Sequence, residues 1–366
     1  MMQVRIEDIK RIVVRGTNWV GDSVMTVPAL RALRRLIPAA DITLAIRPSA
    51  EGLFAEADFI DDLLLYDRQG ISSVAHQARE WRRRKFDLAV VFQNAFEAAL
   101  IPFVSRIPFR LGYATEARQL LLTNPVPVPE WRSSRHEVFY YLYLIAALEQ
   151  ALLGTNTVCD NEPEAELHLS ESSKTEALAI LRANGVVANR IVVAICPGSI
   201  NSRAKRWPAE RYAGLADRLI EQSRAEVLLI GSRDEADVSR DVVSRMKQKP
   251  IVLTGKTSLA QATAVLGLAD LVVTNDTGPA HIAAALGSPT LVIFGPTNPL
   301  TTRPFSPLAE VLRHPPECAP CMLRDCPIDH RCMTAISVEE VFEHTLVLLN
   351  RKKIAMNARS LCDSVA

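Results

Sequence analysis

Three turns in the second half of the chain carry residue types that bind phosphate and hydroxyl groups. They are "CPGSINSRAKRWP" (196–208), "GSRDEAD" (231–237) and "NDTGPAH" (275–281). A lysine and the N–H groups at a helix start would hold an anion, and acidic side chains such as Asp234 and Glu235 would accept hydrogen bonds from ribose hydroxyls. The residues that we expect to bind this ligand are Ser199, Lys205, Arg206, Gly231, Ser232, Asp234, Asp276, Thr277, Gly278 and His281.

The third turn contains Asp-Thr-Gly (276–278), which is also the tripeptide of aspartic proteases. Those enzymes are all-β and use two copies, whereas this chain has one copy between a strand and a helix, so we disfavour a protease. Pro279 suits the first turn of a helix, where its missing N–H costs nothing. Two interpretations stay open: a nucleoside diphosphate site, with neither a P-loop nor a G-x-G-x-x-G motif, or Asp276 acting only as a helix cap.

A comparable turn in the first half is "RGTNWVGDSVMTVP" (15–28), in which Asp22 stands at the start of a helix. Asp22 is either an N-cap or a carboxylate that accepts a proton from a substrate hydroxyl. The sequence leaves both interpretations open.

The elements that position these turns alternate between strand and helix, which is typical of parallel sheets with crossover helices. In the first half we predict strands at 11–16, 41–46, 61–67 and 87–92, and helices at 23–38, 74–86 and 136–154, the last of them amphipathic. The proline-rich segment 122–131 is expected to be extended. Residues 155–170 are interpreted as a linker between domains.

The second half repeats this plan. Ser173 and Glu176 have the spacing of a capping box for a helix that Gly185 ends. We predict five strands, at 191–196, 226–231, 251–255, 271–275 and 290–295, with helices at 208–223, 234–248, 258–269 and 279–287. The fold class is therefore α/β, with two doubly wound domains. In such sheets ligands bind at the carboxyl ends of the strands, where the three turns lie.

Composition excludes several classes of protein. With 366 residues and a net charge of +1, the chain is long enough for two domains and lacks the basic excess of a nucleic-acid binder. No apolar stretch reaches the length of a membrane span, and no secretory signal is visible, so we expect a cytoplasmic protein.

Three motifs together resemble glycosyltransferase family 9, the lipopolysaccharide heptosyltransferases. They are "NWVGDSVMTVPALRALRRLIP", "PGSINSRAKRWP" and "TNDTGPAHIAAALGSPTLVIFGPTNP", and the first of them, with "FQNAFEAALIPFVSRIPFRLGY", is most similar to the heptosyltransferase II group. The resemblance covers about residues 10–350. It implies a GT-B fold, with two Rossmann-like domains facing a cleft: an acceptor domain (1–165), a donor domain (166–345) and a tail (346–366).

The resemblance also implies an activity and roles for residues. The activity is inverting, metal-independent transfer of heptose from ADP-L-glycero-β-D-manno-heptose, with no cofactor, to an inner-core heptose of lipopolysaccharide. Asp22 matches the family's general base, Lys205 the lysine that contacts the donor phosphates, and residues 276–278 the turn that holds the sugar and diphosphate. Where relatives often have an acidic or aromatic residue, this chain has "SINSRA" (199–204), which leaves the fine donor contacts open.

We further expect a monomer that works on a lipid-anchored acceptor, at the cytoplasmic face of the inner membrane, with no nucleic-acid partner. A basic cluster at 79–86 is either a solvated helix face or a patch that docks core phosphates. Candidate acceptor-binding residues are Asn18, Trp19, Asn94, Arg118 and Arg135.

Four of the seven cysteines lie in "CAPCMLRDCPIDHRC" (318–332). Cys318, Cys321, Cys326 and Cys332 are compatible with a structural zinc or iron–sulfur site, although their spacing matches no standard ligand set. Two other functions stay open: a sugar-nucleotide epimerase, which shares the double Rossmann plan and turns over the donor without an acceptor, and a non-catalytic nucleotide-sugar binding module.

Overall fold

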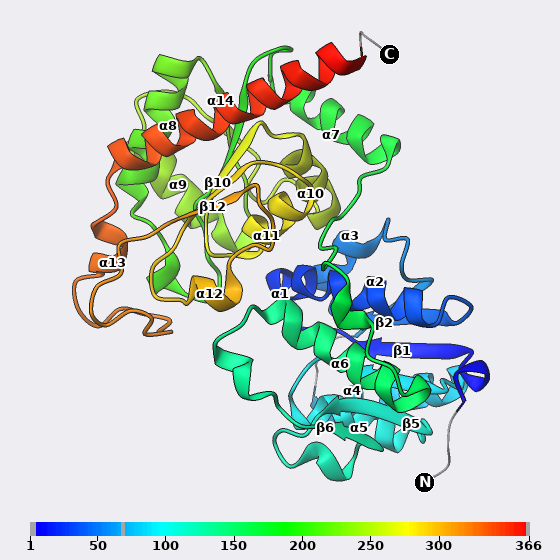
Figure 1. Cartoon of the computed structure of the whole chain (residues 1–366). Coiled ribbons are helices and arrows are strands. Elements are labelled where there is room, and N and C mark those ends of the chain that lie inside the picture. Colours follow the sequence, from blue (N-terminus) through cyan, green and yellow to red (C-terminus); the bar gives the residue numbers. More distant parts are fainter. Residues whose placement is uncertain (1–4, 67–69, 364–366) are drawn as a thin grey trace. The chain divides into compact units, whose positions relative to one another are not determined.

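The computed structural model describes residues 5–66 and 70–363 and divides into two compact units, Met1–Glu166 and Leu167–Ala366 (Figure 1). Each unit has one six-stranded parallel sheet with helices on both faces. The two Rossmann-like domains predicted from the sequence are therefore confirmed. Asp67, the last residue of one predicted strand, lies outside the described residues.

The first sheet has the strand order β3-β2-β1-β4-β5-β6, which is the order of a dinucleotide-binding fold. Its strands are β1 (Arg11–Arg15), β2 (Asp41–Ile46), β3 (Asp62–Leu65), β4 (Leu88–Val91), β5 (Phe109–Tyr113) and β6 (Asn124–Val126). The sequence analysis missed β5, and β6 lies in the segment predicted only to be extended. Strand β5 pairs with β4, and β6 pairs with β5 and forms the edge of the sheet. Pro125 is tolerated in β6 because an edge strand has fewer hydrogen bonds to lose.

The helices of the first unit are α1 (Val20–Met25), α2 (Val27–Leu36), α3 (Glu51–Phe54), α4 (Gly70–Arg84), α5 (Phe96–Val104) and α6 (Glu137–Leu153). Helix α2 packs with α6, and α4 packs with α5. The single helix predicted for 23–38 is wrong: it divides at Thr26, two residues before Pro28, whose nitrogen has no hydrogen to donate. Helix α6 is not amphipathic, because consecutive residues such as Tyr140, Tyr141 and Leu142 are all buried.

The second sheet has the order β12-β11-β10-β7-β8-β9, the same topology as the first. Its strands are β7 (Val192–Cys196), β8 (Glu226–Leu229), β9 (Ile251–Val252), β10 (Leu271–Asn275), β11 (Thr290–Ile293) and β12 (Ala309–Leu312). The prediction of five strands omitted β12, whose four residues, mostly half-buried at the sheet edge, give a weak strand signal.

The helices of the second unit are α7 (Glu171–Ala183), α8 (Ala209–Ser223), α9 (Ala236–Arg245), α10 (Leu259–Leu268), α11 (Gly278–Ala285), α12 (Pro299–Thr302), α13 (Arg331–Thr334) and α14 (Val338–Asp363). Helix α10 packs with α7 and α11, and α8 packs with α9 and α14. The capping box predicted at Ser173 is wrong, because Ser170 caps α7 by accepting a hydrogen bond from the N–H of Ser173. Helix α14 continues through residue 346, where we expected a tail to begin.

Short 3₁₀ helices join several of these elements, at Ile6–Asp8, Pro48–Ala50, Arg118–Leu120, Glu130–Ser133, Val158–Asp160, Arg203–Lys205 and Arg233–Glu235. Of the helices in the part of the chain that the structure describes, none is long and apolar enough to cross a membrane.

The central strands of each sheet fix where its functional turns lie. In the second unit β7 pairs with β10 so that Cys196 stands opposite Thr274, and the turns after these two strands therefore begin side by side. In the first unit β1 pairs with β4, with Arg15 opposite Val91. Both pairs are the point where the strand order reverses, which is where doubly wound sheets bind ligands.

Candidate functional site

Asn275, the last residue of β10, joins the two turns at the switch point of the second sheet. Its side chain is fully buried. The amide Nδ2 donates to the carbonyl oxygens of Pro197 (2.9 Å) and Gly198 (3.2 Å), and Oδ1 accepts from the N–H of Trp207 and the hydroxyl of Tyr212, both at 2.9 Å. One side chain thus fixes both ends of the turn that carries Lys205. Sequence reasoning missed this role, although a polar residue ending an apolar strand is a signal for it.

Lys205 and Asp276 meet beside this anchor. The ammonium Nζ of Lys205 lies 2.7 Å from Oδ2 of Asp276 and 3.1 Å from its carbonyl oxygen. Thr297, another residue that the sequence analysis did not select, donates to the same carboxylate oxygen at 2.7 Å. The interpretation of Asp276 as a helix cap is wrong, since Thr277 is the N-cap of α11.

The start of α11 adds a second source of positive potential. Thr277 is extended, and α11 begins at Gly278, one residue before the predicted start, so that Pro279 lies in its first turn as expected. The N–H groups in the first turn of a helix have no partner within the helix, and the helix dipole is positive there. His281 lies in the same helix but is buried. The ammonium of Lys205 and the beginning of α11 therefore form a site for an anion.

The turn after β8 brings a carboxylate against the turn after β7. Oε2 of Glu235 accepts hydrogen bonds from the N–H (2.8 Å) and the hydroxyl (2.9 Å) of Ser232. A Cβ atom placed on Gly198 would lie 2.1 Å from Oε1 of Glu235, so a larger residue there would displace the Glu235 side chain. Asp234 is exposed. Of the two acids proposed for ribose hydroxyls, Glu235 is thus the one that faces the first turn.

Two predicted donor residues stabilise the turn itself. Ser199 is buried, and its carbonyl oxygen accepts from both Nε (3.1 Å) and a terminal nitrogen (2.8 Å) of the Arg206 guanidinium. Arg206 therefore closes the turn 199–206 internally. Gly231 and Ser232 remain at the accessible edge of the neighbouring turn.

In the first unit, three predicted residues lie in or beside the turn that follows β1. Oδ1 of Asn18 accepts from the hydroxyl of Tyr66 at 2.9 Å, and Trp19 is the N-cap of α1 with 49% of its surface exposed. Asp22 lies in the first turn of α1, so the interpretation of Asp22 as an N-cap is wrong. Burial raises the pKa of Tyr141, and the nearby charge of Asp22 adds to this effect.

Asn94 lies in the turn after β4 and is contacted by Arg118, which follows β5. Arg118 is fully buried, and its guanidinium donates to the carbonyl oxygens of Tyr113 (2.7 Å) and Gln93 and to Oδ1 of Asn94 (3.2 Å). Burial lowers the pKa of Arg118 to about 10. The expectation that Arg118 contacts an acceptor is therefore corrected: its donors are directed to the protein, and it orients Asn94.

Arg135 differs from Arg118 because its side chain is exposed, stacked on Phe139 at 3.9 Å from the ring centre. In the basic cluster, Trp81 is a core residue, and Arg84 pairs with Glu80 and Asp62. Arg83 also pairs with Glu80.

The four cysteines of the segment 318–332 are free thiols. Among the described residues no three histidine, cysteine, aspartate or glutamate side chains converge so that they could hold a metal ion.

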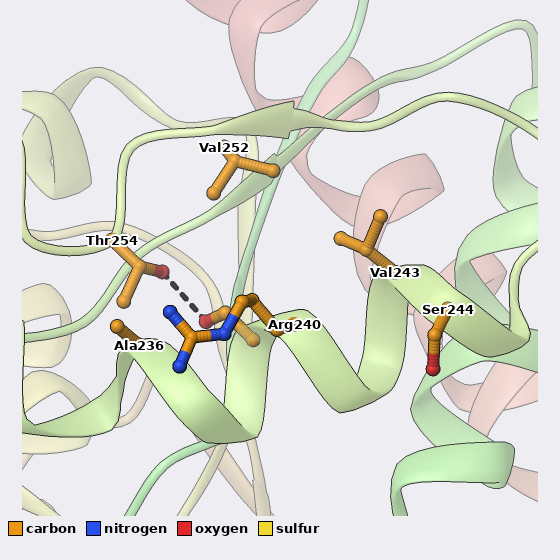
Figure 2. A pocket seen from close by; sticks show the side chains of 7 residues that line it. Ala236, Arg240, Val243, Ser244, Val252 and Thr254 are labelled. Carbon is orange, nitrogen blue, oxygen red and sulfur yellow. Dashed lines mark hydrogen bonds between the residues drawn. The ribbon is translucent and has the colours of Figure 1, made fainter.

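A pocket between α9 and β9 includes Ala236, which also belongs to the turn 231–237 (Figure 2). The hydroxyl groups of Ser239 and Thr254 bond to each other at 2.7 Å, and the other lining residues are Arg240, Ser244 and three apolar side chains. None of the predicted site residues lines it, so it does not compete with the site beside Asn275.

Comparison with known proteins agrees with this geometry. The model of the family "Glycosyltransferase family 9 (heptosyltransferase)" matches residues 74–331. The lipopolysaccharide heptosyltransferase 2 of Escherichia coli K12 is 29% identical over 268 residues, which are 70% of this chain and 74% of that protein. A lipooligosaccharide heptosyltransferase 2 of Campylobacter jejuni is 26% identical, over 94% of this chain and 100% of the relative.

A solved structure, that of the ADP-heptose LPS heptosyltransferase II of E. coli, is similar throughout. It has a TM-score of 0.79 at 26% identity, over 94% of this chain and 100% of that chain.

Proposed function

Since the chain belongs to glycosyltransferase family 9, we propose that it transfers L-glycero-D-manno-heptose from ADP-heptose to an inner-core heptose of lipopolysaccharide. The relatives named as heptosyltransferases support this substrate class. The observation that carries the proposal is the ion pair of Lys205 and Asp276 beside the start of α11, at the switch point of the second sheet.

The second unit binds the donor. The diphosphate of ADP lies between Lys205 and the N-terminus of α11, where the ammonium and the helix dipole neutralise its charge. Glu235 and Asp234, in the neighbouring turn, are the acids available for ribose hydroxyls. Two donors of the Lys205 ammonium are directed at Asp276, and a lysine has three, so one remains for a phosphate oxygen.

The chemistry is a single displacement. The acceptor hydroxyl attacks the anomeric carbon of heptose, the bond from that carbon to the β-phosphate oxygen breaks, and its electron pair leaves with ADP. Asp22 takes the proton of the acceptor hydroxyl, a step that typically contributes about 10²–10⁴-fold. Lys205 and the start of α11 stabilise the charge that develops on ADP, and the charge that they supply makes a divalent metal unnecessary.

The first unit binds the acceptor. Trp19 offers an exposed aromatic face on which a sugar ring stacks, and Asn18 and Asn94 offer amide groups for its hydroxyls. Arg135 is exposed and offers a charge for the phosphates of an anionic core lipid. The acceptor is anchored in the cytoplasmic face of the inner membrane, to which the enzyme, a monomer, binds peripherally.

The test is transfer from ADP-heptose to a heptose-terminated core lipid in the presence of EDTA. We expect product from the wild-type protein, and no release of free heptose or conversion of the donor when the acceptor is omitted. Donor conversion without an acceptor would indicate an epimerase instead. Binding of ADP-heptose with no product from any core acceptor would indicate a binding module.

A further inference from the structure

The cysteine-rich segment (residues 318–332) binds the turn that carries Lys205. Both backbone polar groups of Ala204, the residue before Lys205, are bonded to it. The N–H of Ala204 donates to the carbonyl oxygen of Arg324 at 2.9 Å, and its carbonyl oxygen lies 2.6 Å from Nε2 of His330. Since a carbonyl oxygen only accepts, Nε2 of His330 carries the proton.

Ser202 strengthens this contact. Its hydroxyl is buried and lies 3.3 Å and 3.2 Å from the carbonyl oxygens of Leu323 and Arg324. Arg203 pairs with Asp325 at 2.6 Å, but both side chains are largely exposed, so this pair contributes little. The buried contacts of Ser202 and Ala204 therefore determine where the turn lies.

The same segment also contacts the turn after β11 (295–297), whose Thr297 bonds to Asp276, the partner of Lys205. The N–H of Met322 donates to the carbonyl oxygen of Pro296 at 2.9 Å. A Cβ atom on Gly295 would lie 2.4 Å from Sδ of Met333, so the start of this turn is packed closely against α13. Thr297, the next residue after Pro296, donates to Asp276. The segment thus contacts both the turn that carries Lys205 and the turn whose Thr297 donates a hydrogen bond to Asp276.

We propose that His330 is a positioning residue for donor binding: by holding the carbonyl group of Ala204 it fixes the backbone from which Lys205 reaches the diphosphate. The proposal rests on the proposed function, because it takes ADP as the ligand of Lys205. Its physical reason is that a lysine side chain has several rotatable bonds and loses much entropy on binding. Fixing its backbone leaves fewer arrangements for the ligand to select among.

The test compares His330→Ala with His330→Gln. His330 has a φ of +56°, in the left-handed region, so both variants carry a similar backbone cost there. Glutamine restores an N–H close to the position of Nε2, whereas alanine does not. We expect His330→Ala to weaken the binding of ADP, measured by calorimetry, about tenfold, which is the size of one lost hydrogen bond, and His330→Gln to recover most of it.

His314→Ala is the matched control. His314 is an exposed histidine of the same unit, it pairs with Glu340, and we expect its variant to bind ADP like the wild type. If His330→Ala does not fold, Ser202→Ala replaces it and is expected to weaken ADP binding in the same direction.

A double-mutant cycle with Lys205→Ala separates positioning from a general loss of structure. If His330 acts through Lys205, His330→Ala has no further effect on ADP binding once Lys205 is alanine. An equal effect in both backgrounds, or unchanged binding in His330→Ala, overturns the positioning role alone. A wild-type protein that neither binds ADP nor transfers heptose overturns the proposed function instead.

Discussion

The ammonium of Lys205 lies 2.7 Å from the carboxylate of Asp276, a residue 71 positions later in the chain. The carboxylate is almost completely buried, with 4% of its side chain exposed, while 27% of the lysine side chain is exposed. The buried charge is therefore paired inside the protein, and the lysine still reaches solvent. This arrangement places a cation at the site without leaving an unpaired buried carboxylate, which would be costly.

Replacing Lys205 tests its role in binding the diphosphate. We expect Lys205→Ala to lower kcat/KM for ADP-heptose by about 10²-fold, because a charge that stabilises the leaving group is lost, and Lys205→Arg to recover part of it. Steady-state kinetics measure this effect. The control is Lys174→Ala, which removes a lysine paired with Glu171 on the surface of α7. Unchanged kinetics in Lys205→Ala would remove Lys205 from the catalytic site.

Replacing Asn275 tests its role as the anchor of the donor turns. Asn275→Ala leaves the buried carbonyl groups of Pro197 and Gly198 without their donor, and we expect the free energy of unfolding of the protein to fall by about 3 kcal/mol. Urea denaturation followed by circular dichroism measures this change. Asn161→Ala, which removes an exposed asparagine that donates to Thr157, is expected to change stability by less than about 0.5 kcal/mol. Equal stability of the two variants would contradict the anchor role.

Replacing Asp22 tests its role as the general base. We expect Asp22→Asn to lower kcat by about 10²–10⁴-fold and to leave the affinity for ADP unchanged, because the donor site that we propose lies in the second unit. The acid limb of the pH–kcat profile is expected to disappear with the carboxylate. Asp8→Asn, at an exposed aspartate paired with Arg5, is the control. A variant that loses ADP binding as well would indicate a different role.

Glu149 predicts a pH dependence of stability in the first unit. Burial opposes its ionisation, but hydrogen bonds from Thr157, Val158 and Thr155 outweigh this effect and lower the pKa of Glu149 to about 2. Because the folded pKa lies below the unfolded value of about 4.3, this stabilisation is present above pH 4.3 and is lost as the pH falls toward 2.

Glu149→Gln tests this dependence. We expect the variant to be less stable than the wild type at pH 7, and the difference in free energy of unfolding to shrink as the pH falls from about 5 to 2. Glu171→Gln, at an exposed glutamate of α7, is the control and should show no such trend. A constant difference across this pH range would contradict the assigned pKa.

Much of the fold follows from local pattern. Runs such as "DITLAI" and "LVVTN" consist mainly of apolar residues, which is typical of strands covered on both faces, and their predicted bounds match β2 and β10. The errors occur where local signals are weak or compete. The half-buried edge strand β12 was missed, and Pro28 divided a helix that periodicity predicted as continuous.

The sequence by itself determined two parallel sheets, three polar turns at the carboxyl ends of their strands, and a glycine-proline start for α11, because each depends on residues that are neighbours in the chain. The tertiary structure alone decided which side chains in those turns are used. Asn275 donates to the carbonyl oxygen of Gly198, 77 positions earlier in the chain, and Glu235 lies against Gly198, 37 positions earlier. Arg118 is buried instead of exposed. Such contacts depend on strand register and packing, which bring together residues that no local pattern connects.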